Sequence, residues 1–272
     1  MNRVWMAGLL AVSGLLAQEK QPQPKSQKEV EAIQAMFQAP DPDARIKAAD
    51  FLIKKFADTE FKALALYFTA VSYEQKNDFE KMVVYAEETL KADAKNYAAM
   101  LMLAGGIAKR TRENDLDREE KLATSDKYAK SALEALKTAQ KPNPTISDEQ
   151  WEAAKKDYAS TAHEAFAMAA MLRKKYDAAI AEFKLSVEGA AQADPSTMVR
   201  LGQAYIAAGK HDDAIAILDK VMNAADVNPQ IKQFAQAERV RAMQAKGAVK
   251  PAAPPAPPAP PAAPAPPAEK KQ

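Results

Sequence analysis

One stretch near the C-terminal end of the chain decides the fold: residues 201–229 read LGQAYIAAGKHDDAIAILDKVMNAADVNP. Two runs of helix-forming residues flank Gly209, which allows a tight turn because glycine adopts positive φ without strain. The small Gly202 lets two antiparallel helices approach closely, while Tyr205 and Leu218 fill the space between neighbouring hairpins. The stretch therefore predicts a helical hairpin.

The same spacing of small and large side chains recurs along the chain, which predicts an array of such hairpins. The expected units are a degenerate N-terminal hairpin at 26–62, repeats at 63–96, 97–140, 147–194 and 195–228, and a capping helix at 229–246. The last stretch is amphipathic, and a stack needs a terminal helix with one polar side to close its core.

The middle of the array departs from a regular period. Met82 and Ser125 occupy equivalent places 43 residues apart, and Ser125 and Ala179 are 54 apart, whereas the regular repeat is about 34 residues long. The extra residues predict a long second helix at about 117–139 and a long first helix at about 148–172. The centre of the array is therefore expected to bulge.

The repeat resembles the tetratricopeptide repeat, whose pattern runs Leu-Gly, Tyr, Ala, a large apolar residue and Pro. The clearest copy fills these places with Leu201, Gly202, Tyr205, Ala214, Leu218 and Pro229. The resemblance implies an all-α fold, a right-handed superhelical array of antiparallel helical hairpins (an α-solenoid) with a C-terminal capping helix. The Trp that often opens the family's repeat is missing.

Composition excludes several classes of protein. Hydrophobic residues make up 47% of the chain and aromatic residues 7%, and there is no Cys, so disulfide frameworks, thiolate metal sites and cysteine nucleophiles are ruled out. The formal net charge of +2 provides no strong field to attract nucleic acid or an anionic membrane surface.

The two ends of the chain have compositions of their own. Residues 1–17 combine Arg3 with an apolar run that is too short to span a bilayer, which is typical of a signal peptide. Cleavage is expected after Ala17, followed by a linker at 18–25, and the mature chain is expected in the periplasm or secreted, without stable membrane insertion. Residues 247–272 form a Pro/Ala-rich tail that is expected to be disordered.

The sequence offers no set of residues for catalysis. His163 and His211 are the only histidines, and their places in the repeat predict packing roles. Motifs for metal, acyl-transfer, phosphate-loop and dinucleotide chemistry are absent. We therefore expect no catalytic, metal-binding or cofactor-binding residues and no enzymatic activity.

The resemblance implies that the first helices of successive hairpins line a concave groove. The groove positions carried over from the family are Leu64, Tyr67, Val71, Leu101, Met168, Met171, Val199, Gln203 and Ile206. Their apolar character favours an amphipathic helix or an extended apolar peptide as the ligand. In the alternative interpretation, the long central helices or the capping helix fill the groove, and the methionines are ordinary core residues.

Two functions remain open at this point. The first is an exported, non-catalytic scaffold of the bacterial envelope that binds a protein or peptide partner through its concave face. The alternative is a structural or assembly component of the envelope that self-associates as a homo-oligomer, with the Pro/Ala tail as a spacer. Neither function involves nucleic acid or a cofactor.

Overall fold

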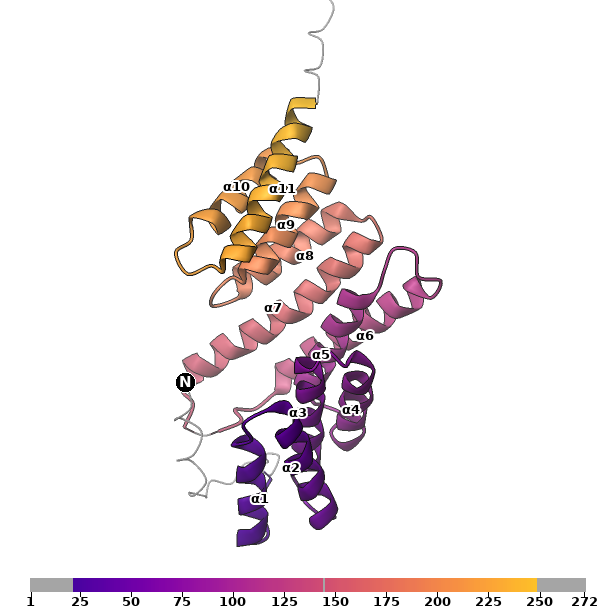
Figure 1. Ribbon diagram of the computed structural model, residues 1–272, viewed down its shortest axis with the longest axis vertical. Helices are drawn as coiled ribbons and strands as arrows, with labels where there is room; N and C mark the ends of the chain where they lie inside the picture. The colour runs from indigo at the N-terminus through magenta and orange to yellow at the C-terminus, as the bar shows by residue number, and fades with distance from the viewer. Residues whose placement is uncertain (1–21, 144, 249–272) are drawn as a thin grey trace, which may run out of the picture.

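The computed structural model describes residues 22–143 and 145–248, and every regular element in these ranges is a helix (Figure 1). The helices are α1 Gln27–Phe37, α2 Pro42–Lys55, α3 Lys62–Gln75, α4 Phe79–Ala92, α5 Tyr97–Arg110, α6 Arg118–Thr138, α7 Asp148–Leu172, α8 Tyr176–Gly189, α9 Pro195–Ala207, α10 His211–Asn223 and α11 Pro229–Ala248. The predicted signal peptide, its predicted cleavage site and most of the Pro/Ala-rich tail lie outside the described residues.

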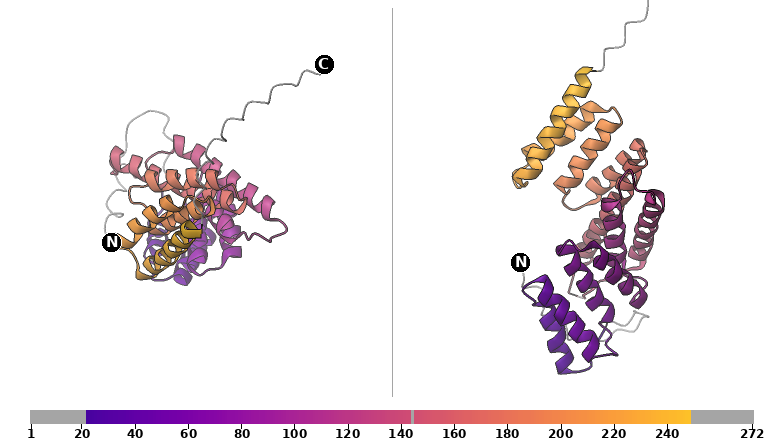
Figure 2. Two further views of the ribbon diagram at one scale, coloured as in Figure 1. Left: turned by 90° about the horizontal axis from the view of Figure 1, so that it is seen from above. Right: turned by 45° about the vertical axis from the view of Figure 1, so that its right-hand side comes forward.

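Consecutive helices pack against each other along the whole series, and α5 also contacts α7 while α9 also contacts α11. The helices follow an open curve from α1 at one end to α11 at the other (Figure 2). The chain is therefore all-α, a solenoid of antiparallel hairpins, as the resemblance implied. Within the described ranges, none of the helices is both long and apolar enough to cross a membrane.

Local sequence explains where the helices begin. Asp41 and Asp194 each precede a proline and accept a hydrogen bond from a backbone amide of the first turn, which satisfies a donor that the helix itself leaves unpaired. Ser147 and Gln150 form a reciprocal capping box at the start of α7. The long helix expected at about 148–172 is α7, Asp148–Leu172.

Three of the hairpins share one type of turn. Its third residue, Asn77, Lys174 or Gly209, has a positive φ of 56°, 59° or 73°. In each turn the next amide donates to a carbonyl five residues back, for example from Lys210 to Tyr205 at 2.8 Å, as in a Schellman motif. The expectation that Gly209 permits a turn is thus confirmed, and Asn77 and Lys174 occupy the same conformation without glycine.

Close approach of helices is visible at Gly202. A Cβ atom at this position would lie 2.9 Å from Cγ of Leu218, which is fully buried on α10. Nearer the N-terminus, a Cβ atom at Gly106 of α5 would lie 2.7 Å from Cε of the buried Met82 of α4. A Cβ atom would therefore crowd Leu218 where α9 meets α10, whereas at Gly106 the flexible end of Met82 would have to move.

Polar contacts between hairpins mostly join residues about one repeat apart. Lys210 pairs with Asp177 across 33 positions of sequence, Lys246 pairs with Asp212 across 34, and Gln203 bonds Glu238 across 35. Arg173 is an exception because the middle of the array is longer: it bonds Asp126 and Glu119, 47 and 54 residues away. Each of these contacts links a hairpin to its neighbour.

Candidate binding surface along α7 and α9

Helix α7 covers the inward side of α5. The predicted groove residue Leu101 is only 5% exposed and packs in one cluster with Ala162 and Ala165 of α7. The ring of Tyr158 on α7 lies 4.9 Å from that of Tyr97 on α5 in an edge-to-face arrangement, which is favourable for aromatic pairs. Leu101 is therefore a core residue and does not face an open groove.

The remaining N-terminal groove residues, all on α3, are partly buried. Leu64 packs against the core cluster that contains Ala49 and Leu52 of α2. Burial raises the pKa of the Tyr67 phenol to about 12, because the charged form would lose its hydration. Val71 is also half-buried. This half of the inward face thus has little open apolar surface.

The capping helix covers a second predicted groove residue. Val199 on α9 is 4% exposed and belongs to a core cluster with Leu218, Val221 and Ala235, the last of which lies on α11. Like Leu101, it is a core residue. Both corrections have the same physical cause, which is that the next-but-one helix, α7 over α5 and α11 over α9, packs on the position.

Three of the predicted residues do come together at one cleft. Met171 of α7 and Gln203 and Ile206 of α9 line a cleft of about 270 Å³, together with Tyr176 at the start of α8 and Arg241 of α11. Met168, one turn before Met171, is partly buried against the core cluster of α7 and α8. The cleft therefore combines apolar side chains with polar and charged ones, among them the ion pair of Glu113 and Lys174.

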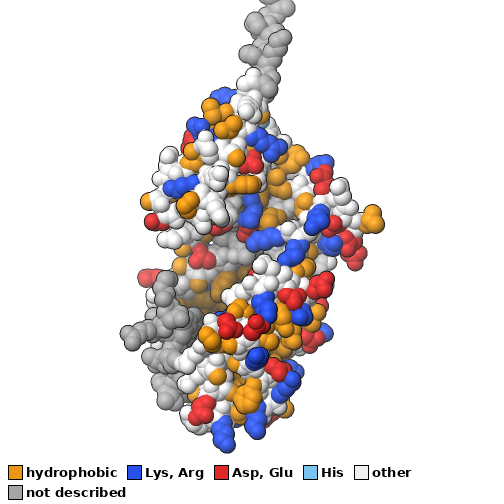
Figure 3. All heavy atoms as spheres, viewed as in Figure 1, with side chains coloured by type: hydrophobic (Ala, Val, Ile, Leu, Met, Phe, Trp, Pro, Cys, Tyr) orange, Lys and Arg blue, Asp and Glu red, His pale blue; other side chains and the backbone are white. Residues whose placement is uncertain are grey.

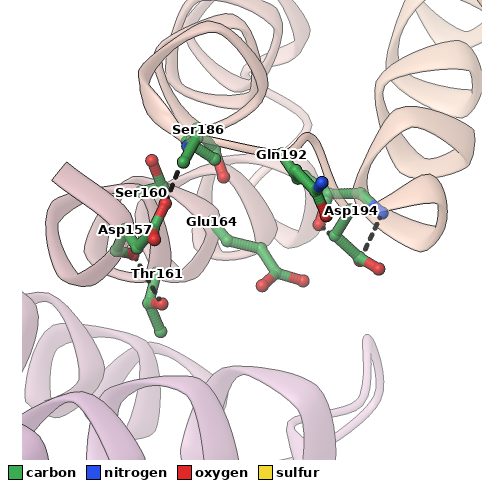
Figure 4. Close-up of a pocket in the computed structure, with 10 residues that line it drawn as sticks. Asp157, Ser160, Thr161, Glu164, Ser186, Gln192 and Asp194 are labelled. Atoms are coloured by element: carbon green, nitrogen blue, oxygen red, sulfur yellow. Dashed lines mark hydrogen bonds between the residues drawn. The ribbon is translucent and has the colours of Figure 1, made fainter. Parts of the chain in front are cut away.

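A larger cleft of about 570 Å³ lies further along α7 and is polar, which the sequence interpretation did not anticipate (Figure 4). Its lining comes from α7, the end of α8, the α8–α9 segment and the start of α9: Asp157, Ser160, Thr161, Glu164, Ser186, Ala190, Ala191, Gln192, Asp194 and Thr197. Thr161 and Glu164 lie on the same side of α7 as Met168 and Met171, at helical spacing. The other positions belong to no recognisable motif.

Most carboxylates of the polar cleft already have partners. Asp157 accepts a hydrogen bond from the amide of Ala191 at 2.8 Å, and Asp194 accepts from the amide of Thr197 at 2.9 Å. Glu164 accepts from Arg200 of α9 at 2.5 Å, with the glutamate side chain 14% exposed. The Glu164–Arg200 pair connects α7 with α9 beside this cleft and holds the two helices in register.

The two histidines have packing roles in this structure. Nδ1 of His163 lies 2.7 Å from a carboxylate oxygen of Glu182, and its ring lies near that of Phe166. His211 is half-buried at the start of α10, and its Nδ1 atom is buried without a hydrogen-bond partner. Among the described residues, no group of His, Asp and Glu side chains is arranged to hold a metal ion.

The fold and the clefts define the class of protein as an α-solenoid of helical hairpins with concave surfaces between its helices (Figure 3). The sequence of residues 170–246 matches the family described as Tetratricopeptide repeat. This match confirms the resemblance drawn from the repeat, and it covers the part of the chain where the pattern is clearest.

Solved structures show the same fold over a longer range. A thermophilic tetratricopeptide-repeat protein of Thermus thermophilus is similar with 15% identity and a TM-score of 0.50, covering 81% of this chain and 98% of its own. A tetratricopeptide-repeat protein of Parabacteroides merdae has 15% identity, covers 83% of this chain and 95% of its own, and has a TM-score of 0.41. A search of curated proteins finds no match. Solenoids of this kind commonly present extended surfaces for binding other proteins.

Proposed function

We propose that this protein is an exported, non-catalytic scaffold that binds an extended or helical segment of a partner protein along α7, α9 and α11. The observation that carries the proposal is the cleft where Met171, Gln203 and Ile206 meet. A cleft that is lined by both apolar and polar side chains, as this one is, suits the binding of a peptide segment.

The two clefts support binding along the C-terminal half of the inward face. Both are lined in part by α7, the larger one by Glu164, which pairs with Arg200, and the smaller one by Met171. A peptide that follows α7 would place apolar side chains near Ile206 and polar or basic ones near Glu164. Methionine at position 171 suits such a surface because its side chain adapts to different ligands.

The binding test uses peptides selected from a random display library against the full chain. Ile206→Glu is expected to weaken the selected peptides about fivefold or more, since truncating or charging a central apolar contact commonly costs about 1 kcal/mol or more. Leu185→Glu is the matched control, because Leu185 is 50% exposed on α8 and lies outside both clefts. Titration calorimetry measures the affinities.

Two results would contradict the proposal. One is a set of peptides that bind Ile206→Glu as tightly as the unaltered chain. The other is a library that returns no peptide whose binding depends on Met171, Gln203 or Ile206. Circular dichroism of each variant establishes that the fold is retained before the affinities are compared.

Export is supported by the sequence of residues 1–17, with Arg3 before an apolar run that ends at Ala17. Protein recovered from cells is expected to lack these 17 residues, and an intact-mass measurement checks this. Recovery of the chain with Met1 retained and embedded in membrane would contradict export as a free protein.

A further inference from the structure

The polar cleft beside α7 carries an excess of negative charge. Asp157 and Glu164 of α7 and Asp194, the residue before α9, line it, and none of its described lining residues is lysine or arginine. Figure 4 shows the side chain of Glu164 extending from α7 towards Asp194. Glu164 pairs with Arg200, whereas Asp157 and Asp194 have no ion pair with any described residue. Two carboxylate charges of the cleft are therefore left without a positive partner.

A buried hydroxyl group in the wall of the polar cleft has no partner either. Ser186 of α8 lines the cleft and is only 6% exposed, and its hydroxyl makes no hydrogen bond with any described residue. The hydroxyls of Ser160 and Thr161 in the same cleft donate to carbonyls of α7. A buried polar group without a partner costs free energy. A ligand in the cleft would supply the partner that Ser186 lacks.

The polar cleft and the smaller cleft lie at two heights along the same pair of helices. Glu164 of α7 contacts Arg200 of α9, and Met171 and Ile206, seven and six residues further on, line the smaller cleft together. The two helices therefore run parallel here. At a rise of 1.5 Å per residue, the two heights are separated by about 10 Å.

The smaller cleft has the opposite balance of charge. Lys174 and Arg241 line it, and Glu113 supplies a carboxylate that pairs with Lys174. A positive group on a ligand is therefore repelled from the smaller cleft and attracted to the polar one. The charges of the two clefts thus distinguish the two ends of a bound segment.

We propose that the two clefts together recognise a basic residue and an apolar residue placed about three positions apart in an extended peptide. This inference rests on the proposed function. The spacing follows because an extended strand rises about 3.3 Å per residue and the two heights are about 10 Å apart. The lysine or arginine enters the polar cleft, where its hydrogen bonds to Asp157 and Asp194 are strengthened by charge. The hydroxyl of Ser186 accepts from a donor of the same segment.

The peptides that the display library returns provide the first test. Among those whose binding depends on Ile206, we expect a lysine or arginine about three positions from an apolar residue. Replacing that basic residue with glutamine should weaken binding about fivefold at low ionic strength. The difference should shrink at about 0.5 M salt, because salt screens the charges.

Variants of the polar cleft provide the second test. A chain with both Asp157→Asn and Asp194→Asn loses two charges but keeps the acceptor oxygens, and asparagine caps a helix as well as aspartate does. In this double variant, replacing the basic residue with glutamine should have little effect, as a mutant cycle measures. Asp41→Asn is the matched control, because Asp41 caps α2 before a proline but lies outside both clefts. It should leave the fivefold difference unchanged.

The unpartnered hydroxyl gives an independent check. Ser186→Ala should weaken the same peptides about threefold, since it removes a hydrogen-bond acceptor from the cleft. The melting temperature should not fall, because the folded chain has no hydrogen bond to lose at this side chain. Circular dichroism measures the melting temperature of every variant.

The outcomes separate this inference from the proposed function. Peptides that depend on Ile206 but carry no basic residue would overturn the inference and leave the proposed function in place. The same result follows if the double variant retains the full fivefold difference, since the basic residue would then contact another surface. If no selected peptide depends on the smaller cleft, the proposed function and this inference both fail.

Discussion

The two halves of the inward face have the same origin in the repeat but different surfaces. On α5, the groove position Leu101 lies beneath Ala162 and Ala165 of α7, and aromatic rings from both helices pack beside it. On α9, Gln203 and Ile206 line an open cleft. The comparison teaches that a groove position inherited from a repeat becomes a binding position only where no neighbouring helix covers it.

The inserted turns lie in α6 and α7, which have 21 and 25 residues, whereas most helices of the array have 13 or 14. Trp151 in the added part of α7 is 6% exposed, and its indole N–H donates to the carbonyl of Ala139. Trp151 thus anchors the added turns in two ways, through the burial of its ring and through the hydrogen bond of its indole N–H. They stabilise the centre of the array.

The largest expected effect comes from placing the same charge in the two halves. Leu101→Glu should cost about 4 kcal/mol or more of the free energy of unfolding, because the carboxylate has no partner in the core. Ile206→Glu should cost about 1 kcal/mol or less, since its side chain borders the cleft. Urea unfolding followed by circular dichroism compares them, and similar losses would show that the C-terminal half is filled too.

A smaller effect concerns the packed aromatic side chains of the N-terminal half. The pKa of Tyr67 is raised to about 12 in the folded chain. Between pH 10 and 12 the unfolded chain therefore binds fewer protons at this residue than the folded chain does. Stability present below pH 10 is therefore lost as the pH rises, by about 2 kcal/mol at pH 12. Tyr67→Phe should remove this part of the loss.

The measurement is the free energy of unfolding of both proteins at pH 9 and pH 11.5. Burial raises the pKa of Tyr97 as well, so the variant should retain some dependence on pH. An identical decline in the two proteins would mean that Tyr67 is accessible to solvent and that the N-terminal half is more open than its packing indicates.

The smallest effect distinguishes the close helix contact of the last repeat from the less crowded position on α5. Gly202→Ala should lose about 1 kcal/mol because its Cβ would meet Leu218 at 2.9 Å. Gly105→Ala should gain about 0.5 to 1 kcal/mol, since its Cβ would meet nothing within 4 Å and alanine favours the helix. Thermal melting should show a lower melting temperature for Gly202→Ala and a higher one for Gly105→Ala. A higher melting temperature for both variants would mean that α9 and α10 do not make their close contact at Gly202.

Much of the fold could be predicted because the repeat is a local signal. The helix pairs, the turn at Gly209 and the length of α7 follow from spacing, small residues and capping residues such as Ser147. Each depends on neighbours in sequence, where periodicity and turn chemistry are reliable guides. The resemblance to a known repeat then supplied the arrangement of the hairpins.

The candidate site was harder to predict, because it depends on which helix covers which. Spacing placed Leu101 and Ile206 on the same inward face of the array, and only the packing of neighbouring helices makes Leu101 a core residue while Ile206 lines a cleft. The polar cleft combines Asp157 with Gln192 and Asp194, which share no motif. A sequence pattern carries no information about such a meeting of distant segments.

The contacts that join residues one repeat apart also determine how the chain folds. Asp177 with Lys210 and Asp212 with Lys246 lie 33 and 34 residues apart, and no loop longer than about two repeats must close before such a contact forms. Chains with mainly local contacts fold in microseconds to milliseconds, much faster than sheets of the same size. The array is therefore expected to fold rapidly, starting at any hairpin and adding neighbours one by one.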